Sequence, residues 1–138
     1  MCAINGFTWE DKALITRMDR VLKHRGPDDT GIYLDKGISL GHNRLSIIDL
    51  SKKGHQPMSD REGTLTIVYN GEIYNFKDIR RELEKKGYSF ASGSDTETLL
   101  YAYKEYGSSC LQMLNGMFAF AVWDSEKKEL FLARDRLG

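Results

Sequence analysis

The sequence predicts an α+β protein in which helices cover antiparallel sheets. Strand-like segments come first along the chain, helical segments follow, and two more strand-like segments close it. The run Met117–Trp123 is continuously apolar, as is typical of a strand buried on both faces. Leu130–Arg134 follows after a short turn and is expected to be its antiparallel partner. This order favours separate layers of sheet and helix over a doubly wound parallel sheet.

The first predicted elements are a strand and a helix. Cys2–Phe7 is mostly apolar and is expected to be a short buried strand. Thr8 has a carboxylate three residues later, at Asp11, which is typical of the start of a helix. The segment 24–29 contains Gly and Pro and is expected to end that helix. Its buried face is predicted from residues at helical spacing: Leu14, Met18, Val21 and Leu22.

Three further strands are predicted in the next part of the chain. Gly31–Leu34 and Ile38–Ile48 are strand-like runs separated by the short turn Asp35-Lys36-Gly37. Leu65–Tyr69 is another, and it leads into Asn70-Gly71. That dipeptide is the strongest local signal for a tight hairpin turn.

Two longer helices and a short one are predicted before the last strands. Phe76, Ile79 and Leu83 mark a helix that is expected to stop at Gly87. Ser94-Asp95-Thr96-Glu97 matches the capping box that begins many helices. The helix that follows has its apolar face at Leu99, Leu100 and Tyr103, and the short one lies around Leu111 and Leu114.

Composition limits the classes of protein to which the chain can belong. With 138 residues, 41% hydrophobic and 29% charged, it fits one globular domain. Lys and Arg balance Asp and Glu at 20 each, which gives no electrostatic case for nucleic acid or an anionic membrane. We find neither a membrane-spanning run nor a signal peptide. The two cysteines make no disulfide framework, so a cytoplasmic location fits best.

Cys2 is the best candidate nucleophile. Removal of Met1 would leave a thiol and a free α-amine on one residue, a self-contained nucleophile and base. A chance cysteine at a disordered terminus is the alternative. The sequence has no phosphate-binding loop, no Gly-x-Ser-x-Gly elbow and no metal-ligand spacing among its three histidines. Cys110 lies in a helical segment and is expected to be a buried small hydrophobe.

Ordered motifs along nearly the whole chain resemble one family. The motifs are Met1-Cys2-Ala3-Ile4, His24-Arg25-Gly26-Pro27-Asp28-Asp29, Gly41-His42-Asn43-Arg44-Leu45-Ser46-Ile47-Ile48-Asp49, Gly54-His55-Gln56-Pro57-Met58, Tyr69-Asn70-Gly71-Glu72-Ile73-Tyr74-Asn75, Ser94-Asp95-Thr96-Glu97, Leu114-Asn115-Gly116-Met117-Phe118-Ala119-Phe120 and Ala133-Arg134-Asp135-Arg136-Leu137-Gly138. With these motifs the chain resembles the glutaminase domain of glutamine-hydrolysing asparagine synthetase, a class II glutamine amidotransferase.

The resemblance implies an N-terminal-nucleophile hydrolase fold, with two packed antiparallel sheets between helical layers (αββα). It also implies release of ammonia from the glutamine side-chain amide through a thioester on Cys2. The family's oxyanion hole corresponds to the side-chain amide of Asn70 and the backbone N–H of Gly71. A hairpin turn at Asn70-Gly71 remains compatible with this role, since a turn would also fix the two donors.

The resemblance also implies the residues that bind glutamine. Arg44 matches the residue that holds the α-carboxylate, a task that suits a guanidinium fork. Asp95, helped by Glu72, matches a ligand of the α-ammonium group, although a carboxylate in the first turn of a helix is favourable anyway. Backbone groups near Ile47 and Ile48 are expected to line the same pocket. No metal or cofactor is expected in this domain.

The sequence departs from the family pattern in two ways. Ala3 stands where the family has Gly, and its methyl group could crowd the substrate or restrict the backbone. We expect tolerance or a modest loss. The family also continues beyond Gly138 with more strands and then with the synthetase domain that uses ATP and Mg²⁺. We therefore treat residues 1–138 as one partial amidotransferase domain, whose missing strands would leave an unpaired sheet edge.

Three hypotheses follow for function. The first is a glutaminase that supplies ammonia for asparagine synthesis by a synthetase domain in cis or trans. The second is a module that keeps the fold and binds glutamine or a partner without turnover. The third is an amidotransferase that serves a polysaccharide- or peptide-modifying acceptor domain. The expected partners are glutamine, the synthetase domain and possible further copies of the chain, with no nucleic acid or membrane.

Overall fold

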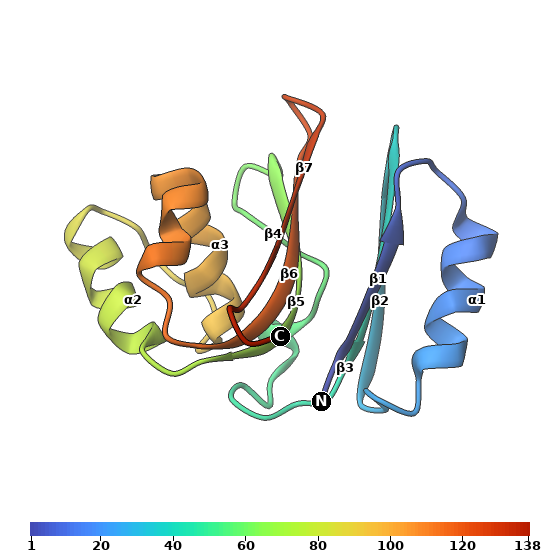
Figure 1. Ribbon diagram of the computed structural model, residues 1–138, viewed down its shortest axis with the longest axis horizontal. Helices are drawn as coiled ribbons and strands as arrows, with labels where there is room; N and C mark the ends of the chain where they lie inside the picture. The colour runs from blue at the N-terminus through green and yellow to red at the C-terminus, as the bar shows by residue number, and fades with distance from the viewer.

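The computed structural model describes all 138 residues as two antiparallel sheets between helices (Figure 1). The three-stranded sheet has the order β1-β3-β2, with β1 at Ala3–Phe7, β2 at Asp29–Asp35 and β3 at Ile38–Arg44. The four-stranded sheet has the order β4-β5-β6-β7, with β4 at Met58–Ser59, β5 at Leu65–Ile73, β6 at Gly116–Asp124 and β7 at Glu129–Arg134. The helices are α1 (Lys12–Leu22), α2 (Phe76–Lys85) and α3 (Asp95–Tyr106), with short 3₁₀ turns at Lys52–Gly54 and Gly107–Gln112.

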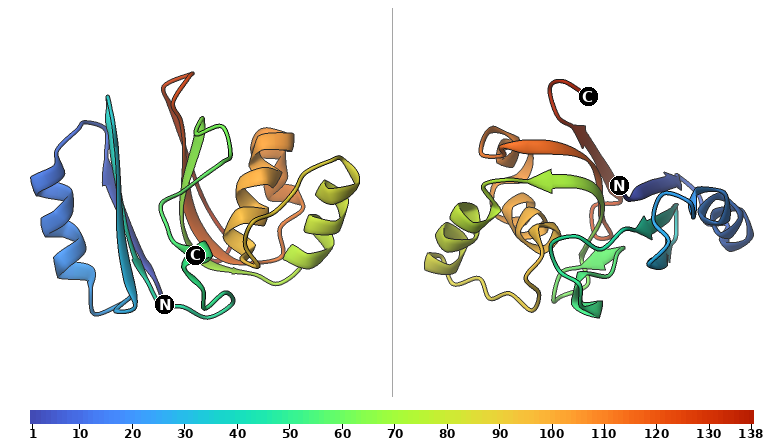
Figure 2. Two further views of the ribbon diagram at one scale, coloured as in Figure 1. Left: turned by 180° about the vertical axis from the view of Figure 1, so that it is seen from behind. Right: turned by 90° about the horizontal axis from the view of Figure 1, so that it is seen from below.

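The layers follow the order predicted from the sequence. Helix α1 covers the outer face of the three-stranded sheet, and α2 and α3 cover the outer face of the four-stranded sheet (Figure 2). The inner faces of the two sheets face each other. The α+β prediction, with two antiparallel sheets between helical layers, is therefore confirmed.

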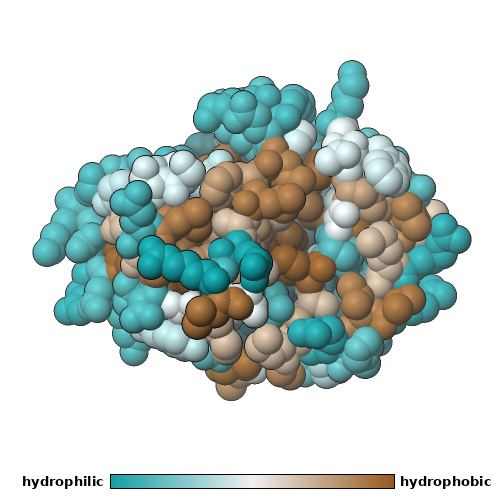
Figure 3. Space-filling view, viewed as in Figure 1, coloured by the Kyte–Doolittle hydropathy of each residue, from teal (hydrophilic) through white to brown (hydrophobic).

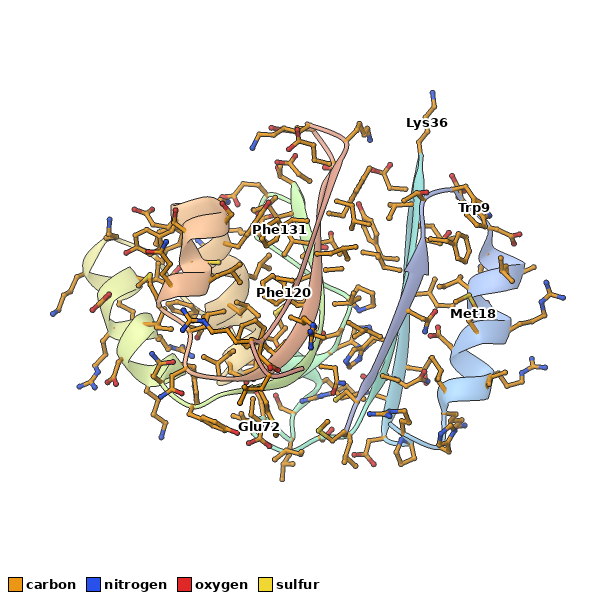
Figure 4. All side chains as sticks on the ribbon, in the orientation of Figure 1. Trp9, Met18, Lys36, Glu72, Phe120 and Phe131 are labelled. Atoms are coloured by element: carbon orange, nitrogen blue, oxygen red, sulfur yellow. The ribbon has the colours of Figure 1, made fainter.

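Two separate hydrophobic cores hold these layers together. The larger core lies between the four-stranded sheet and its helices and contains 14 buried residues. Phe120 of β6 is 1% exposed, and its ring lies 6.0 Å from that of Phe131 of β7 (Figure 4). Cys110 is fully buried in this core, as predicted, and burial raises the pKa of its thiol to about 11. The smaller core lies between the sheets and consists of Ile38, Leu40, Val68, Ala121 and Trp123.

Helix α1 differs in detail from its prediction. Its N-cap is Asp11, whose Oδ1 accepts the Leu14 N–H at 2.8 Å, so the helix begins at Lys12, four residues after Thr8. Val21 is 73% exposed and does not belong to the buried face. The two buried residues are Ile15 and Asp19. Asp19 was missed because hydrophobic spacing cannot identify a buried carboxylate, here one that accepts a hydrogen bond of 2.7 Å from Asn5 on β1.

The prediction of a hairpin turn at Asn70-Gly71 is wrong. Strand β5 runs straight through both residues, which lie opposite Ala119 and Phe118 of β6. Neither residue has the positive φ that a type I′ turn requires. Gly71 is instead needed for close approach of the strands, because a Cβ there would lie 2.2 Å from the carbonyl oxygen of Met117.

Other boundaries shift by a few residues. Strand β3 ends at Arg44, not at Ile48, and the chain then crosses from one sheet to the other near the N-terminus (Figure 1). Helix α2 ends before Gly87, as predicted. Only half of the expected capping box forms at α3. Ser94 Oγ accepts the Glu97 N–H at 3.3 Å, but the Glu97 carboxylate binds the backbone N–H groups of the preceding loop.

β1 and β7 are edge strands of the two sheets and lie on the same side of the molecule (Figure 2). β1 pairs only with β3, and β7 pairs only with β6. Apolar side chains gather at the centre of this face (Figure 3), and Leu132 of β7 is 67% exposed. None of the three α-helices combines the length and the apolar character that a membrane crossing requires.

Candidate active site

The candidate site is a cavity of about 50 Å³ at the end of the two sheets that carries the N-terminus. Segments far apart in the sequence meet there: the start of β1, the end of β3 with the loop after it, the second half of β5 and the first turn of α3. Met1 also lines this cavity. The structure brings together all eight predicted site residues in its lining: Cys2, Arg44, Ile47, Ile48, Asn70, Gly71, Glu72 and Asp95.

Cys2 is held in place by the end of β3. Its sulfur accepts the Leu45 N–H at 3.3 Å and lies 3.5 Å from the Leu45 carbonyl oxygen, to which the thiol donates. Its own carbonyl oxygen accepts from Arg25 Nε at 3.3 Å. Ile4 of β1 packs against the core between the sheets, and side chains two residues apart share a face of a strand. The Cys2 side chain therefore points into the space between the sheets.

The same alternation settles the position of Ala3. Its side chain lies on the opposite face of β1 from Cys2, it is 5% exposed, and it does not line the cavity. Its φ is not positive, so the position does not require glycine. The methyl group of Ala3 therefore neither crowds the cavity nor strains the backbone, and its effect on activity stays a prediction.

The backbone of β5 presents a free donor to the cavity at Gly71. The N–H of Tyr69 donates to Gln56 Oε1 at 2.6 Å, and the N–H of Ile73 donates to Asp95 Oδ2 at 3.1 Å. Both groups therefore point away from β6. Backbone groups two residues apart on a strand point the same way, so the Gly71 N–H between them also points away from β6. It meets no strand there, because β4 pairs with β5 only at Ile67 and Thr66.

Asn70 offers its side chain instead of its backbone. Because the neighbouring Tyr69 and Gly71 direct their N–H groups away from β6, the N–H and C=O of Asn70 belong to the ladder with β6. Its side chain shares a strand face with Val68, which packs in the core between the sheets. The Asn70 amide and the Cys2 sulfur thus enter the same space from opposite sheets.

Arg44 provides a buried positive charge in the cavity wall. It is 7% exposed, its Nη1 donates to the carbonyl oxygen of Ser51 at 2.9 Å, and its Nη2 donates to that of Asp49. Gly54 lies directly against the guanidinium, since a Cβ there would lie 2.2 Å from Nη2. The guanidinium is therefore oriented by backbone contacts and carries no carboxylate partner of its own.

Asp95 provides the buried negative charge. It is 5% exposed, and its Oδ2 accepts from the Tyr69 hydroxyl at 2.8 Å as well as from the Ile73 N–H. Burial raises the pKa of this carboxyl group, while the two hydrogen bonds act in the opposite direction. Its position in the first turn of α3 alone does not explain this carboxylate, because its side chain accepts hydrogen bonds from two groups of β5.

The remaining predicted residues lie around the cavity with more exposure. Glu72 on β5 is half-buried, at the same end of the molecule as the N-terminus (Figure 4). Ile47 and Ile48 are 56% and 41% exposed in the loop after β3. Their side chains thus contribute little to the cavity wall, which fits a contribution from the loop backbone.

Sequence reasoning gave no role to three residues that support this site. Tyr69, Gln56 and His42 lie inside recognised motifs, but only their three-dimensional contacts reveal what they do. The fully buried His42 has its Nε2 3.1 Å from the Tyr69 carbonyl oxygen, which can only accept, so Nε2 donates. Burial lowers the pKa of His42 to about 4, so its ring is neutral at pH 7.

The arrangement combines a cysteine sulfur with two neutral donors and two opposite charges. A nucleophile beside an amide side chain and a free N–H suits attack on an acyl carbon whose oxygen becomes negative. A buried guanidinium and a buried carboxylate suit the carboxylate and ammonium groups of an α-amino acid. The cavity is thus equipped for an acyl compound that carries an amino-acid group.

Comparisons with known proteins agree with this chemistry. Residues 1–138 match the protein family described as "Glutamine amidotransferase domain". Asparagine synthetase [glutamine-hydrolyzing] 3 of Bacillus subtilis is 44% identical over all of this chain, and asparagine synthetase B [glutamine-hydrolyzing] of Escherichia coli is 42% identical over all of it. The chain spans 24% and 26% of those two proteins, about a quarter of their length.

A solved structure supports the fold independently. The glutamine phosphoribosylpyrophosphate amidotransferase of B. subtilis superposes with a TM-score of 0.79 at 23% identity, over 98% of this chain and 37% of the other. At that identity the likeness concerns the fold alone, which is of the N-terminal-nucleophile hydrolase type. The chain belongs to the glutamine amidotransferase domain family and corresponds to the glutaminase portion of glutamine-hydrolysing asparagine synthetases.

Proposed function

We propose that the protein hydrolyses glutamine to glutamate and ammonia through a thioester on Cys2. The observation that carries this proposal is the single cavity in which Cys2, Asn70 and Gly71 meet the buried charges of Arg44 and Asp95. In this proposal the two charges hold the carboxylate and ammonium groups of glutamine, with help from Glu72 and the backbone at Ile47 and Ile48. The side-chain amide then lies against the sulfur.

The proposed reaction has two halves. The Cys2 sulfur attacks the amide carbon, and the developing oxyanion accepts hydrogen bonds from the Asn70 side chain and the Gly71 N–H. The C–N bond breaks, and ammonia leaves with the proton that the α-amine of Cys2 took from the thiol. Water then attacks the thioester, its proton passes to the same α-amine, and the C–S bond breaks to give glutamate and the free thiol.

Removal of Met1 is part of this proposal. While Met1 is present, the nitrogen of Cys2 is a peptide nitrogen and cannot act as a base. Met1 also lines the cavity, and 54% of its surface is exposed. Its removal would therefore free the α-amine and enlarge the cavity.

We further propose that the ammonia serves asparagine synthesis in a synthetase domain, in cis or in trans. The names of the relatives support this use, and the ATP and Mg²⁺ of the synthesis would belong to that other domain. The chain as a type-2 amidotransferase domain would then supply nitrogen without a cofactor of its own.

The test is product formation by the purified protein after mass spectrometry has established loss of Met1. We expect equal amounts of glutamate and ammonia from glutamine. Asparagine, which is shorter by one methylene, should give far less product because its amide carbon cannot reach the sulfur while its α-amino acid group is held. Met1-free protein that binds glutamine and releases neither product would contradict the proposed reaction.

A further inference from the structure

The hydroxyl group of Tyr69 is buried against the carboxylate of Asp95. Tyr69 is 2% exposed, and its hydroxyl donates to Asp95 Oδ2 at 2.8 Å. The N–H of Ile73 donates to the same oxygen at 3.1 Å. Strand β5 therefore occupies Oδ2 with two donors, while Oδ1 accepts from no side chain. Oδ1 is thus the oxygen left for a partner in the cavity.

The backbone of Tyr69 is held by two side chains. Its N–H donates to Gln56 Oε1 at 2.6 Å, and its carbonyl oxygen accepts from His42 Nε2 at 3.1 Å. The Gln56 amide also donates to Thr96 Oγ1 at 3.2 Å, one residue after Asp95. These side chains take the place of a neighbouring strand beside this part of β5. The Tyr69 ring and the first turn of α3 are thereby locked in one relative position.

Because Asp95 is buried, its carboxylate needs a hydrogen-bond donor to stay ionised. Burial favours the neutral form of a carboxyl group, and only the ionised form can attract an ammonium group. Other titratable groups line the cavity: Cys2 before β1, Arg44 at the end of β3, Asp49 in the loop that follows and Glu72 on β5. Of these, Asp49 and Glu72 have the same sign as Asp95. The Asp49 carboxylate already accepts hydrogen bonds from the backbone N–H groups of Ser51 and Gly93, whereas Glu72 would compete with Asp95 for the same cation. The Tyr69 hydroxyl is the one side-chain donor to Asp95.

We propose that Tyr69 is a positioning residue that sets the preference of the site for an α-amino acid. Its hydroxyl acts through Asp95, whose carboxylate it orients toward the α-ammonium group of the substrate. This inference rests on the proposed function, because it takes Asp95 as the ammonium ligand. It predicts that recognition of the ammonium group, and of nothing else in the substrate, depends on this hydroxyl.

The test compares two ligands that differ only in the α-amino group. Binding of glutamine and of glutaramate, the analogue without that group, is measured by calorimetry in the Cys2→Ala background, where turnover cannot interfere. Tyr69→Phe should raise the glutamine Kd about tenfold, the effect of losing one hydrogen bond to a charged group, and leave the glutaramate Kd within about twofold. The matched control is Tyr101→Phe. Tyr101 lies on α3 and is also buried, at 8% exposure, but its hydroxyl donates to no carboxylate, so both affinities should stay unchanged.

The pH dependence of glutamine binding provides a second readout that a purely structural role would not move. The Tyr69 hydroxyl favours the ionised form of Asp95, so its removal raises the pKa of Asp95 further. The loss of glutamine affinity on acidification should therefore begin at higher pH in Tyr69→Phe, and glutaramate should show no such change.

The possible outcomes separate this inference from the proposed function. If Tyr69→Phe weakened the binding of both ligands equally, or left the ratio of their Kd values unchanged, the role of Tyr69 would be overturned. The glutaminase proposal would remain intact. If the Cys2→Ala protein bound no glutamine at all, glutamine would not be the substrate of this site. This inference would then fail together with the proposed function. Selective loss of glutamine affinity supports the inference even where wild-type protein releases no ammonia.

Discussion

Replacing Cys2 by alanine should lower the rate of glutamine hydrolysis about ten-thousand-fold or more. The thiol is the atom that bonds to the substrate, and loss of a nucleophile removes the covalent route altogether. The fold should survive, because Cys2 lies before the first strand and contributes to neither core. The measurement is kcat for glutamate release, with glutamine binding by calorimetry as evidence that the site remains.

Cys110→Ala is the matched control for this variant. Cys110 is buried behind the four-stranded sheet and does not line the cavity. Its replacement should therefore cost some stability and leave kcat unchanged. Appreciable turnover by Cys2→Ala, or loss of turnover in folded Cys110→Ala, would contradict the assignment of the nucleophile.

Replacing Asn70 by alanine should lower kcat about 100- to 1,000-fold with little change in KM. A donor aimed at the oxyanion acts mainly in the transition state, and removal of one such donor typically has this effect. The N–H and C=O of Asn70 are engaged by β6 and are unaffected by the substitution, so the strand should remain in register. Steady-state kinetics with glutamine separate the two parameters.

Asn70→Asp is the companion variant, because it keeps the size of the side chain and removes the donor. It should lose at least as much activity, since a carboxylate would repel the oxyanion. If either variant raised KM at unchanged kcat, Asn70 would bind the ground state and would not belong to an oxyanion hole.

The behaviour of Asn70-Gly71 shows how a local signal can be overridden. The dipeptide favours a turn by its intrinsic conformational preferences, but nine residues of β6 pair continuously with β5 across it. Tertiary pairing therefore decides the conformation, and Gly71 serves the close approach of Met117. The family motif, by contrast, had predicted two donors at these residues, and the strand directs both toward the cavity.

The layers and most elements could be predicted because they depend on local hydrophobic pattern. The run Met117–Trp123 lies within a buried central strand, and Phe76, Ile79 and Leu83 lie within α2. The prediction failed at Val21, since periodicity over one short helix does not define which side faces the sheet. Asp19 shows the same limit. The sequence pattern marks it as a surface residue, although its carboxylate accepts a hydrogen bond from Asn5 inside the fold.

The supporting contacts of the site could not be predicted for a different reason. Tyr69 meets His42, Gln56 and Asp95 across 27, 13 and 26 residues of sequence. No local pattern encodes which backbone groups of a strand will lack a neighbour. Only the short β4, which leaves the edge of β5 open beyond Ile67, explains why side chains bind there.

The most direct test of the whole account is the intact mass and peptide map of the protein after treatment with a diazo-ketone analogue of glutamine. We expect loss of Met1 and a single adduct on Cys2, and excess glutamine should block that adduct. Met1-free protein that forms no adduct on Cys2, or an adduct that glutamine does not block, would contradict an assembled glutamine site. If Met1 were retained, Cys2 would have no free α-amine, and the proposed mechanism would be ruled out.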